Sequence, residues 1–239
     1  VEFAIREGRK AVISTHTINL QEQLMGKDLP IVRQLLASEF DAALLKGRQN
    51  YVCPLRLRRA MDQVGDLFTT SEREELMEIW KWAEATRDGT RSDLDFEPAP
   101  KVWLQVCSES HICTQRTCGP RGNCFYQEAK KRAMKATVLV VNHSLFFSLL
   151  NPEEELLEGE KGFLVPNDFV IFDEAHTLES VAAKALGLRV TQARLRFDLQ
   201  RLYHPKTGKG LLKSARASEA MECVRKVIEE ADVFFDEAG

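Results

Sequence analysis

Four short apolar segments constrain the fold of this chain more than any other feature of its sequence. They are AVIST (11–15), AALLKG (42–47), TVLVVNH (137–143) and FVIFDE (169–174). Each run is continuously apolar rather than alternating, which is typical of strands that are covered on both faces of a sheet. Helical patterns separate several of these runs, and such alternation indicates an α/β fold with a parallel sheet.

Two short helical patterns flank the first predicted strand. The stretch VEFAIREG predicts the last turns of a helix that stops at Gly8. The stretch NLQEQLMG predicts a second helix, with Asn19 as its N-cap, Glu22 three residues later and Gly26 as its end.

Residues 47–135 interrupt the alternation and predict a separate, mostly helical lobe. Within it, TSEREELMEIWKWAEATRDG has helical periodicity, with Ser71 and Glu74 as a capping box and Gly89 as its end. One face of this predicted helix is apolar and consists of Leu76, Ile79, Trp80 and Ala83. The stretch that follows the helix, RSDLDFEPAPKVW, is typical of a loop.

This lobe contains five of the six cysteines of the chain. Cys113, Cys118 and Cys124 are separated by four and five residues, and Cys53 in GRQNYVCPL is the best candidate for a fourth member of the group. The stretch TQRTCGPRGN is too polar for a core, and ordering it without a cross-link would cost much backbone entropy. Metal binding supplies such ordering energy, so the pattern predicts a metal site.

Four thiolates complete the shell of either an iron–sulfur cluster or a tetrahedral zinc ion. Zinc ribbons favour closely spaced pairs, and the chain has no CxxC, so the wider spacing favours the cluster. Cys107 and His111 are alternative ligands, although the stretch WLQVC favours inward packing of Cys107. Cys223 lies on an amphipathic helical pattern and is interpreted as structural.

Acidic residues follow the last apolar segment directly. Asp173 and Glu174 come at the carboxyl end of the predicted strand, which is the edge where open α/β sheets bind ligands. An Asp at this position can hold Mg²⁺ on a nucleotide. The neighbouring Glu can orient or deprotonate an attacking water. The sequence therefore predicts a nucleotide site at this edge, with a solvated strand end as the alternative.

Basic residues surround the proposed metal ligands, and aromatic residues are interleaved with them. Cationic grooves with aromatic platforms bind single strands without sequence choice. The alternatives are solvated helix faces and, for Arg48, hydrogen bonding near the cluster sulfurs. The cations are Lys46, Arg48, Arg56, Arg58 and Arg59 in the first run and Arg116, Arg121, Lys130, Lys131, Arg132 and Lys135 in the second, and the aromatic residues are Tyr51, Phe125 and Tyr126.

The remaining features of the sequence constrain its fold and function only broadly. After Gly187, two helical patterns are broken by HPKTGKG, and no strand is predicted. The net charge of −3 gives no global indication of nucleic-acid binding, so this function rests on local patches. No run of 18 apolar residues exists, and we expect a cytoplasmic protein without a membrane segment.

Several segments resemble, in the same order, the DinG/XPD family of superfamily 2 DNA helicases. The tetrapeptide DEAH at 173–176 resembles motif II, and ISTHTINLQEQL resembles motif Ia. The segments GRQNYVC and CTQRTCGPRGNCFYQEAKKRAMKATVLVVNHSLF precede DEAH in the order found in the family. The gaps of four and five residues between the cysteines match the DinG branch better than the XPD branch.

The resemblance implies a division of the α/β chain into four parts. Residues 1–46 and 136–186 would form parts of the first motor domain, whose parallel sheet carries the DEAH box. Residues 47–135 would form a helical iron–sulfur cluster domain, and residues 187–239 the start of a helical Arch domain.

The resemblance also implies roles for individual residues. Asp173 would bind the Mg²⁺ of Mg·ATP, Glu174 would activate water, and His176 would couple the nucleotide state to the DNA-binding surface. Thr15 and Thr17 would lie near the DNA backbone. A [4Fe–4S] cluster would be held by Cys53, Cys113, Cys118 and Cys124, and the expected DNA contacts from the basic and aromatic set are Arg48, Tyr51, Arg56, Arg121 and Lys131.

The implied function is that of an ATP-dependent 5′→3′ DNA helicase that acts as a monomer on single strands and on forked or displaced-strand duplexes in DNA repair and replication. The chain lacks the phosphate loop GxxxxGK[ST] and a second motor domain. It therefore resembles a fragment, and we expect it not to hydrolyse ATP alone. The alternative is a non-catalytic, zinc-stabilised nucleic-acid-binding module on a degenerate motor fold.

Overall fold

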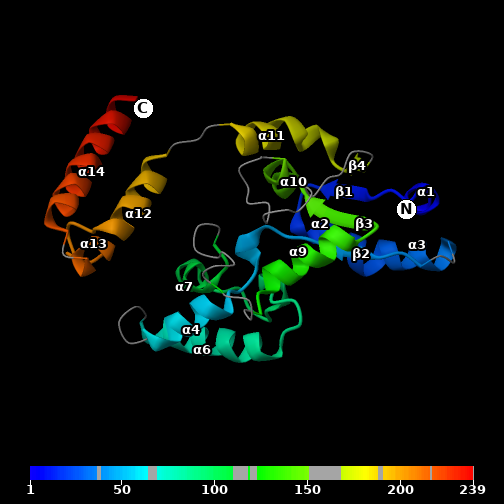
Figure 1. Ribbon diagram of the computed structural model, residues 1–239, viewed down its shortest axis with the longest axis horizontal. Coiled ribbons are helices and arrows are strands. Elements are labelled where there is room, and N and C mark those ends of the chain that lie inside the picture. The colour runs from blue at the N-terminus through cyan, green and yellow to red at the C-terminus, as the bar shows by residue number, and fades with distance from the viewer. Residues whose placement is uncertain are drawn as a thin grey trace. The chain divides into compact units, whose positions relative to one another are not determined.

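The chain forms two compact units, Val1–Leu186 and Gly187–Gly239. The computed structural model, shown in Figure 1, describes residues 1–36, 39–63, 69–109, 118, 123–150, 168–187, 191–215 and 217–238.

The first unit is built on a four-stranded parallel sheet, as the apolar segments predict. Its strands are β1 (Ala11–Thr15), β2 (Ala42–Leu44), β3 (Val138–Asn142) and β4 (Phe169–Phe172), in the order β2-β3-β1-β4. Thr15 of β1 lies opposite Asn142, and Ser14 lies opposite Phe172. The α/β class and the parallel sheet are therefore confirmed.

The expectation that every strand is covered on both faces is wrong for β4. The central strands β1 and β3 are almost fully buried. Ile171 and Phe172 of β4, in contrast, are 43% and 36% exposed. The physical reason is position, because β4 pairs only with β1 and lies at the edge of the described sheet.

Both helices predicted next to the first strand are present in the structure, but the ends of the second one differ from the prediction. Helix α1 (Glu2–Glu7) ends at Gly8, whose φ of 60° is left-handed, as predicted. Helix α2 (Ile18–Gln23) begins with Thr17 as its N-cap rather than Asn19, because the Thr17 hydroxyl accepts a hydrogen bond from the Leu20 amide at 3.3 Å.

Gly26 does not end this helix, which corrects the expectation. The backbone continues through a π-helical turn (Leu24–Asp28) into α3 (Leu29–Leu36). Gly26 lies inside that turn. A π-helical turn absorbs an extra residue without breaking the helix, so the glycine interrupts the α-helical geometry only locally.

The lobe is mostly helical, as expected. It contains α4 (Pro54–Asp62), α6 (Thr70–Ala85), α7 (Pro100–Val106) and α9 (Phe125–Lys135), with short 3₁₀ turns at Arg48–Asn50 and Arg91–Asp93. The predicted apolar face of α6 is confirmed, since Leu76 and Ile79 are fully buried and Trp80 and Ala83 pack against them.

The ends of α6 differ from the prediction. The capping box is formed by Thr69 and Glu72 rather than Ser71 and Glu74, and the Thr69 amide donates to Glu72 Oε2 at 2.7 Å. The helix ends at Ala85, before Gly89. The two candidate boxes have equivalent spacing, and the helix uses the one that begins two residues earlier.

Three main-chain segments meet in the lobe around Cys53. The Val52 amide donates to the Gly89 carbonyl at 2.9 Å, and the Cys53 amide donates to the Val106 carbonyl at 2.8 Å. The Ser108 amide donates to the Tyr51 carbonyl at 2.8 Å. Residues 51–53 are therefore fixed on both sides by backbone pairing.

Helix α10 (His143–Leu149) follows β3 in the chain. A 3₁₀ turn at Ala175–Thr177 and α11 (Leu178–Leu186) follow β4. The second unit contains α12 (Gln192–Leu202), α13 (Leu211–Ser214) and the long α14 (Ser218–Ala238). In its described part, the only β pairing is an isolated bridge between His204 and Lys209.

Among the described residues, no helix combines the length and the apolar composition that crossing a bilayer requires.

Gly89 gives a test of the lobe fold. Its φ is +64°, and a Cβ atom added there would come within 2.3 Å of the Phe125 ring. We predict that Gly89→Ala lowers the free energy of unfolding by about 2–5 kcal/mol, from left-handed strain and overpacking together.

The matched control is Gly8→Ala, which has a similar φ of +60° but nothing within 4 Å of the added atom. Gly8→Ala therefore measures the cost of the left-handed backbone alone, which is a loss of about 1–2 kcal/mol in the free energy of unfolding. Both values come from chemical denaturation of the same chain. Equal losses for the two variants would show that Phe125 does not pack against Gly89.

Candidate functional site

The carboxyl ends of β1, β3 and β4 meet at one edge of the sheet. This edge carries Thr15, Asn142 and Asp173 at the ends of the three strands. The Asp173 amide donates to the Ser14 carbonyl at 2.9 Å, which continues the pairing of β4 with β1 by one residue. The structure therefore brings the predicted acidic strand end to the edge where parallel sheets bind ligands.

The chain turns sharply after Asp173. Glu174 has φ 51° and ψ 44°, and it is the only non-glycine residue of the described part with a positive φ. Its amide donates to Asp173 Oδ1 at 3.0 Å, and its carbonyl accepts from the Thr177 amide at 3.0 Å and from the Thr177 hydroxyl at 2.9 Å. Strained backbone of this kind persists where neighbouring contacts hold it, and it often marks functional sites.

The predicted catalytic side chains lie close together and face solvent. Asp173, Glu174 and His176 are all exposed. His176 Nδ1 lies 3.3 Å from Glu174 Oε2. The edge therefore offers one carboxylate immediately at the strand end and a second that is paired with an imidazole.

His143 follows β3 at the same edge of the sheet. The structure buries it completely and places its Nδ1 2.7 Å from the Ser14 hydroxyl. Its ring also lies near those of Phe172 and His16, at 6.0 and 6.1 Å between centroids. His143 Nε2 is buried, and no hydrogen-bond partner for it is found among the described residues.

Burial lowers the pKa of His143 from its ordinary value. The Asp173 main chain opposes this change, His16 adds to it, and the Asp173 carboxylate opposes it. The imidazole is consequently neutral near pH 7, with one ring nitrogen as a donor and the other as an acceptor. Only the fold reveals the hydrogen bond between Ser14 and His143, because the two residues are distant in the sequence.

Thr15 and Thr17 shape the turn between β1 and α2. The Thr15 side chain is buried, and its hydroxyl donates to the Thr17 carbonyl at 3.1 Å. Thr17 is exposed and caps α2. Of the two, only Thr17 has a surface that a DNA backbone can reach in this arrangement.

Two of the four predicted metal ligands occupy equivalent positions in the lobe. Cys53 is the N-cap of α4, with φ −102° and ψ 111°, and Cys124 is the N-cap of α9, with φ −97° and ψ 110°. The aromatic residues two positions away, Tyr51 and Tyr126, pack edge to face at 5.6 Å. The fold therefore brings together the two chain segments that carry these cysteines.

The other two predicted ligands are less completely placed. Cys118 is half-buried, and Cys113 lies outside the described residues. No group of three or more metal-ligating side chains is found in the described part of the chain. Cys107 packs inward as predicted, and its thiol contacts the Leu104 carbonyl at 3.9 Å.

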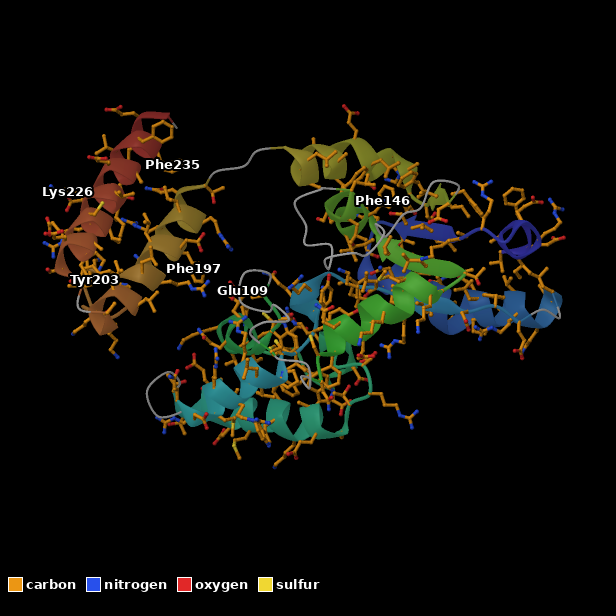
Figure 2. The ribbon with its side chains drawn as sticks, in the orientation of Figure 1. Glu109, Phe146, Phe197, Tyr203, Lys226 and Phe235 are labelled. Atoms are coloured by element: carbon orange, nitrogen blue, oxygen red, sulfur yellow. The ribbon has the colours of Figure 1, made fainter. Side chains whose placement is uncertain are left out.

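Two of the predicted cationic residues, Arg56 and Lys46, bind groups within the protein. The Arg56 guanidinium donates to the Cys107 and Leu104 carbonyls at 2.6 and 2.7 Å and pairs with Glu109 (Figure 2) at 3.1 Å. It therefore binds the carboxyl end of α7. The buried Lys46 ammonium pairs with Glu22 at 2.6 Å and also contacts Ser92.

The expectation that Tyr51 stacks on bases is corrected by its burial. Tyr51 is only 2% exposed, its hydroxyl accepts from the Lys46 amide at 3.1 Å, and burial raises its pKa to about 12. Tyr126 is also buried, and Phe125 is partly buried against the core. These aromatic residues join the sheet to the lobe, because they share one buried cluster with sheet residues such as Val12 and Leu139.

The remaining predicted DNA contacts are Arg48, Lys131 and Arg121. The Arg48 guanidinium lies over the Tyr126 ring at 4.7 Å. Lys131 is exposed and pairs with Glu128 at 2.8 Å. Arg121 lies outside the described residues. Further exposed cations are Arg58, Arg59, Arg132 and Lys135.

Comparison with known proteins identifies relatives. A scan against protein-family models finds no match. The chain is 36% identical over 196 residues to "ATP-dependent DNA helicase YoaA" of Haemophilus influenzae, a match that covers 80% of this chain and 29% of the relative. It is 35% identical over 196 residues to the Escherichia coli protein of the same name, covering 80% and 30%.

A third relative is matched over nearly the whole chain. It is "3'-5' exonuclease DinG" of Bacillus subtilis, which is 27% identical over 245 residues, or 98% of this chain and 25% of the relative. The chain thus spans less than a third of the length of these three relatives. Since the matches extend over 80% or more of its residues and agree with its parallel sheet and the order of its motifs, the chain belongs to the DinG family of helicases.

Proposed function

We propose that the chain is part of the motor of an ATP-dependent 5′→3′ DNA helicase. The observation that carries this proposal is the position of Asp173 and Glu174 at the carboxyl edge of the sheet, hydrogen-bonded to β1. The strand β1 leads directly into the Thr17-capped helix α2, which resembles the DNA-contacting motif. The names of two relatives, which include ATP and DNA, support both partners.

The proposed chemistry at this edge is hydrolysis of ATP. Asp173 binds the Mg²⁺ of Mg·ATP, and the Mg²⁺ neutralises developing phosphate charge when it is bound. Glu174 orients the attacking water and accepts its proton. His176, which lies 3.3 Å from Glu174, transmits the state of that carboxylate to the surface that holds DNA.

The proposed cofactor of the lobe is a [4Fe–4S] cluster held by Cys53, Cys113, Cys118 and Cys124. The placement of Cys53 and Cys124 supports the fit, because both precede helices whose N-termini favour negatively charged thiolates. The bound cluster supplies a cross-link between remote segments. The chain itself positions Cys53 through backbone pairing with the residues around Gly89 and Val106.

The proposed DNA contacts combine Thr17 at the motor with exposed cations of the lobe. Arg58, Arg59, Lys131, Arg132 and Lys135 are exposed and suit the phosphates of a single strand. The lobe then separates forked or displaced-strand duplexes while the motor moves along one strand. We place this activity in DNA repair and replication, in the cytoplasm, with the protein acting as a monomer.

The first test concerns Glu174. In a protein that joins these residues to a phosphate loop and a second motor domain, we predict that Glu174→Gln keeps nucleotide binding and lowers ATP turnover by about 10²-fold or more. Steady-state ATPase assays and nucleotide binding measure the two effects. Glu179→Gln, at an exposed carboxylate in the first turn of α11, is the control that retains turnover. Normal turnover in the Glu174 variant would remove this residue from its role.

The second test concerns the metal. We predict that Cys118→Ser abolishes iron binding and increases hydrogen exchange over residues 47–135, since three thiolates leave the shell open. Cys118 is only half-buried, so the substitution opens no core cavity. Cys223→Ser, at an exposed position of α14, retains iron as the control. Unchanged iron in the Cys118 variant would contradict the ligand assignment, and one zinc per colourless chain would favour the zinc-stabilised module.

The third test concerns polarity. The complete helicase is expected to displace a strand from duplexes with a 5′ single-stranded tail and to leave duplexes with a 3′ tail intact. Gel-based strand displacement with the two substrates measures this difference, and omission of ATP is the control. Preferential unwinding from 3′ tails would overturn the proposed direction.

A further inference from the structure

Charges in the second unit are separated along the sequence. Residues 191–215 contain six Lys or Arg and a single acid, Asp198, whereas residues 217–238 contain seven Asp or Glu and two basic residues. The first stretch comprises α12, the following turn and α13, and the second is α14. The unit therefore has one cationic element packed against one anionic element.

An exposed aromatic residue lies on the cationic element. Phe197 of α12 (Figure 2) is 48% exposed. The guanidinium carbons of Arg194 and Arg201 each lie 5.9 Å from the centre of its ring. Residues three and four apart on a helix are neighbours, so these three side chains form one continuous face. We call Arg194, Phe197 and Arg201 the Arg–Phe–Arg face.

Other residues of α12 bind the acidic helix. Arg196 pairs with Asp232 of α14 at 2.5 Å, and the Gln192 side chain donates to the same carboxylate at 3.0 Å. Leu195 and Leu199 are half-buried on the opposite side of the helix from Phe197. Arg196 and Gln192 thus join α12 to α14, while Phe197 stays 48% exposed on the opposite side of the helix from Leu195 and Leu199.

The geometry of this face matches one class of ligand. A planar aromatic ring that is about half exposed can stack on an unpaired base, and flanking guanidinium groups can bind the adjacent phosphates. Arg194 also donates to Asp198 at 2.9 Å, but a guanidinium has five donors, so this bond does not saturate it. In a duplex the bases are already stacked on each other, so the ring has no comparable partner there.

We propose that the Arg–Phe–Arg face is a binding site for single-stranded DNA, with Phe197 stacked on one base and the two arginines on neighbouring phosphates. This site is additional to the contacts of the motor and the lobe, and it does not depend on ATP hydrolysis. It gives the second unit a direct role in holding the strand.

The test uses the whole 239-residue chain and a fluorescently labelled oligo-dT, with binding followed by fluorescence anisotropy. Phe197→Ala is expected to raise Kd about fivefold or more, because one base stack is lost. Phe234→Ala is the matched control, since Phe234 is 63% exposed but lies on α14 near Asp232 and Asp236. Both phenylalanines are exposed, so neither change opens a buried core, and the control is expected to bind normally.

Two further variants separate stacking from charge. Phe197→Trp is expected to keep the affinity and to add a tryptophan signal that is quenched by oligo-dT. The double variant Arg194→Gln, Arg201→Gln is expected to reduce the slope of log Kd against log salt by about 0.7 per lost phosphate contact. Circular dichroism and thermal unfolding verify that the variants fold.

The outcomes distinguish this site from the proposed function. The site is overturned if Phe197→Ala binds like Phe234→Ala, if duplex DNA shows the same dependence on Phe197, or if the unaltered chain does not bind oligo-dT. If substitution of Arg58 and Lys131 abolishes binding while Phe197→Ala does not, the proposed lobe contacts stand and this site falls. If Phe197→Ala weakens binding while the protein that joins these residues to a phosphate loop and a second motor domain shows no ATPase activity, the site stands and the proposed motor falls.

Discussion

The pairing of β4 with β1 is the constraint on which the candidate site depends. It ends in the hydrogen bond from the Asp173 amide to the Ser14 carbonyl, and it fixes where the chain can turn. Glu174 then adopts a left-handed conformation, so the chain turns immediately after Asp173. The same Ser14 binds His143 through its side chain, so one residue of β1 holds both the acidic strand end and the start of α10. The site is thus assembled from three strands that are remote in sequence.

The lobe also depends on backbone hydrogen bonds between segments that are remote in sequence, but these segments are loops and helix ends rather than strands of one sheet. Cys53 is held by the main chain near Gly89 and Val106, and the Arg56 guanidinium binds the carbonyls that end α7. The buried Lys46 ammonium pairs with Glu22 of α2 and also contacts Ser92 of the lobe. Burial opposes ionisation of Glu22, but hydrogen bonds from Lys46 and Ser92 outweigh it and lower the pKa of this carboxyl. Ser92 therefore links the lobe to an ion pair that lies within residues 1–46.

Local patterns were enough to predict the strands, the helix end at Gly8 and the apolar face of α6. Each of these depends on residues within one or two turns of each other. The caps at Thr17 and Thr69 were missed because several nearby residues have suitable side chains, and the choice among them is made by the surrounding fold. The contact between Ser14 and His143 was missed for a different reason, since strand order, which periodicity does not specify, brings them together. The exposure of β4 likewise depends on its place at the sheet edge.

The aromatic residues show most clearly where sequence reasoning stops. Tyr51 and Phe197 both have arginines nearby in the sequence, and both patterns are compatible with stacking on bases. Tyr51 is buried because its ring fills the junction of sheet and lobe, whereas the packing of α12 uses its other side and leaves Phe197 exposed. Composition alone cannot separate the two cases, because exposure depends on which helix face the neighbouring element covers. A platform for a base therefore has to be identified from the residues that the fold does not use for itself.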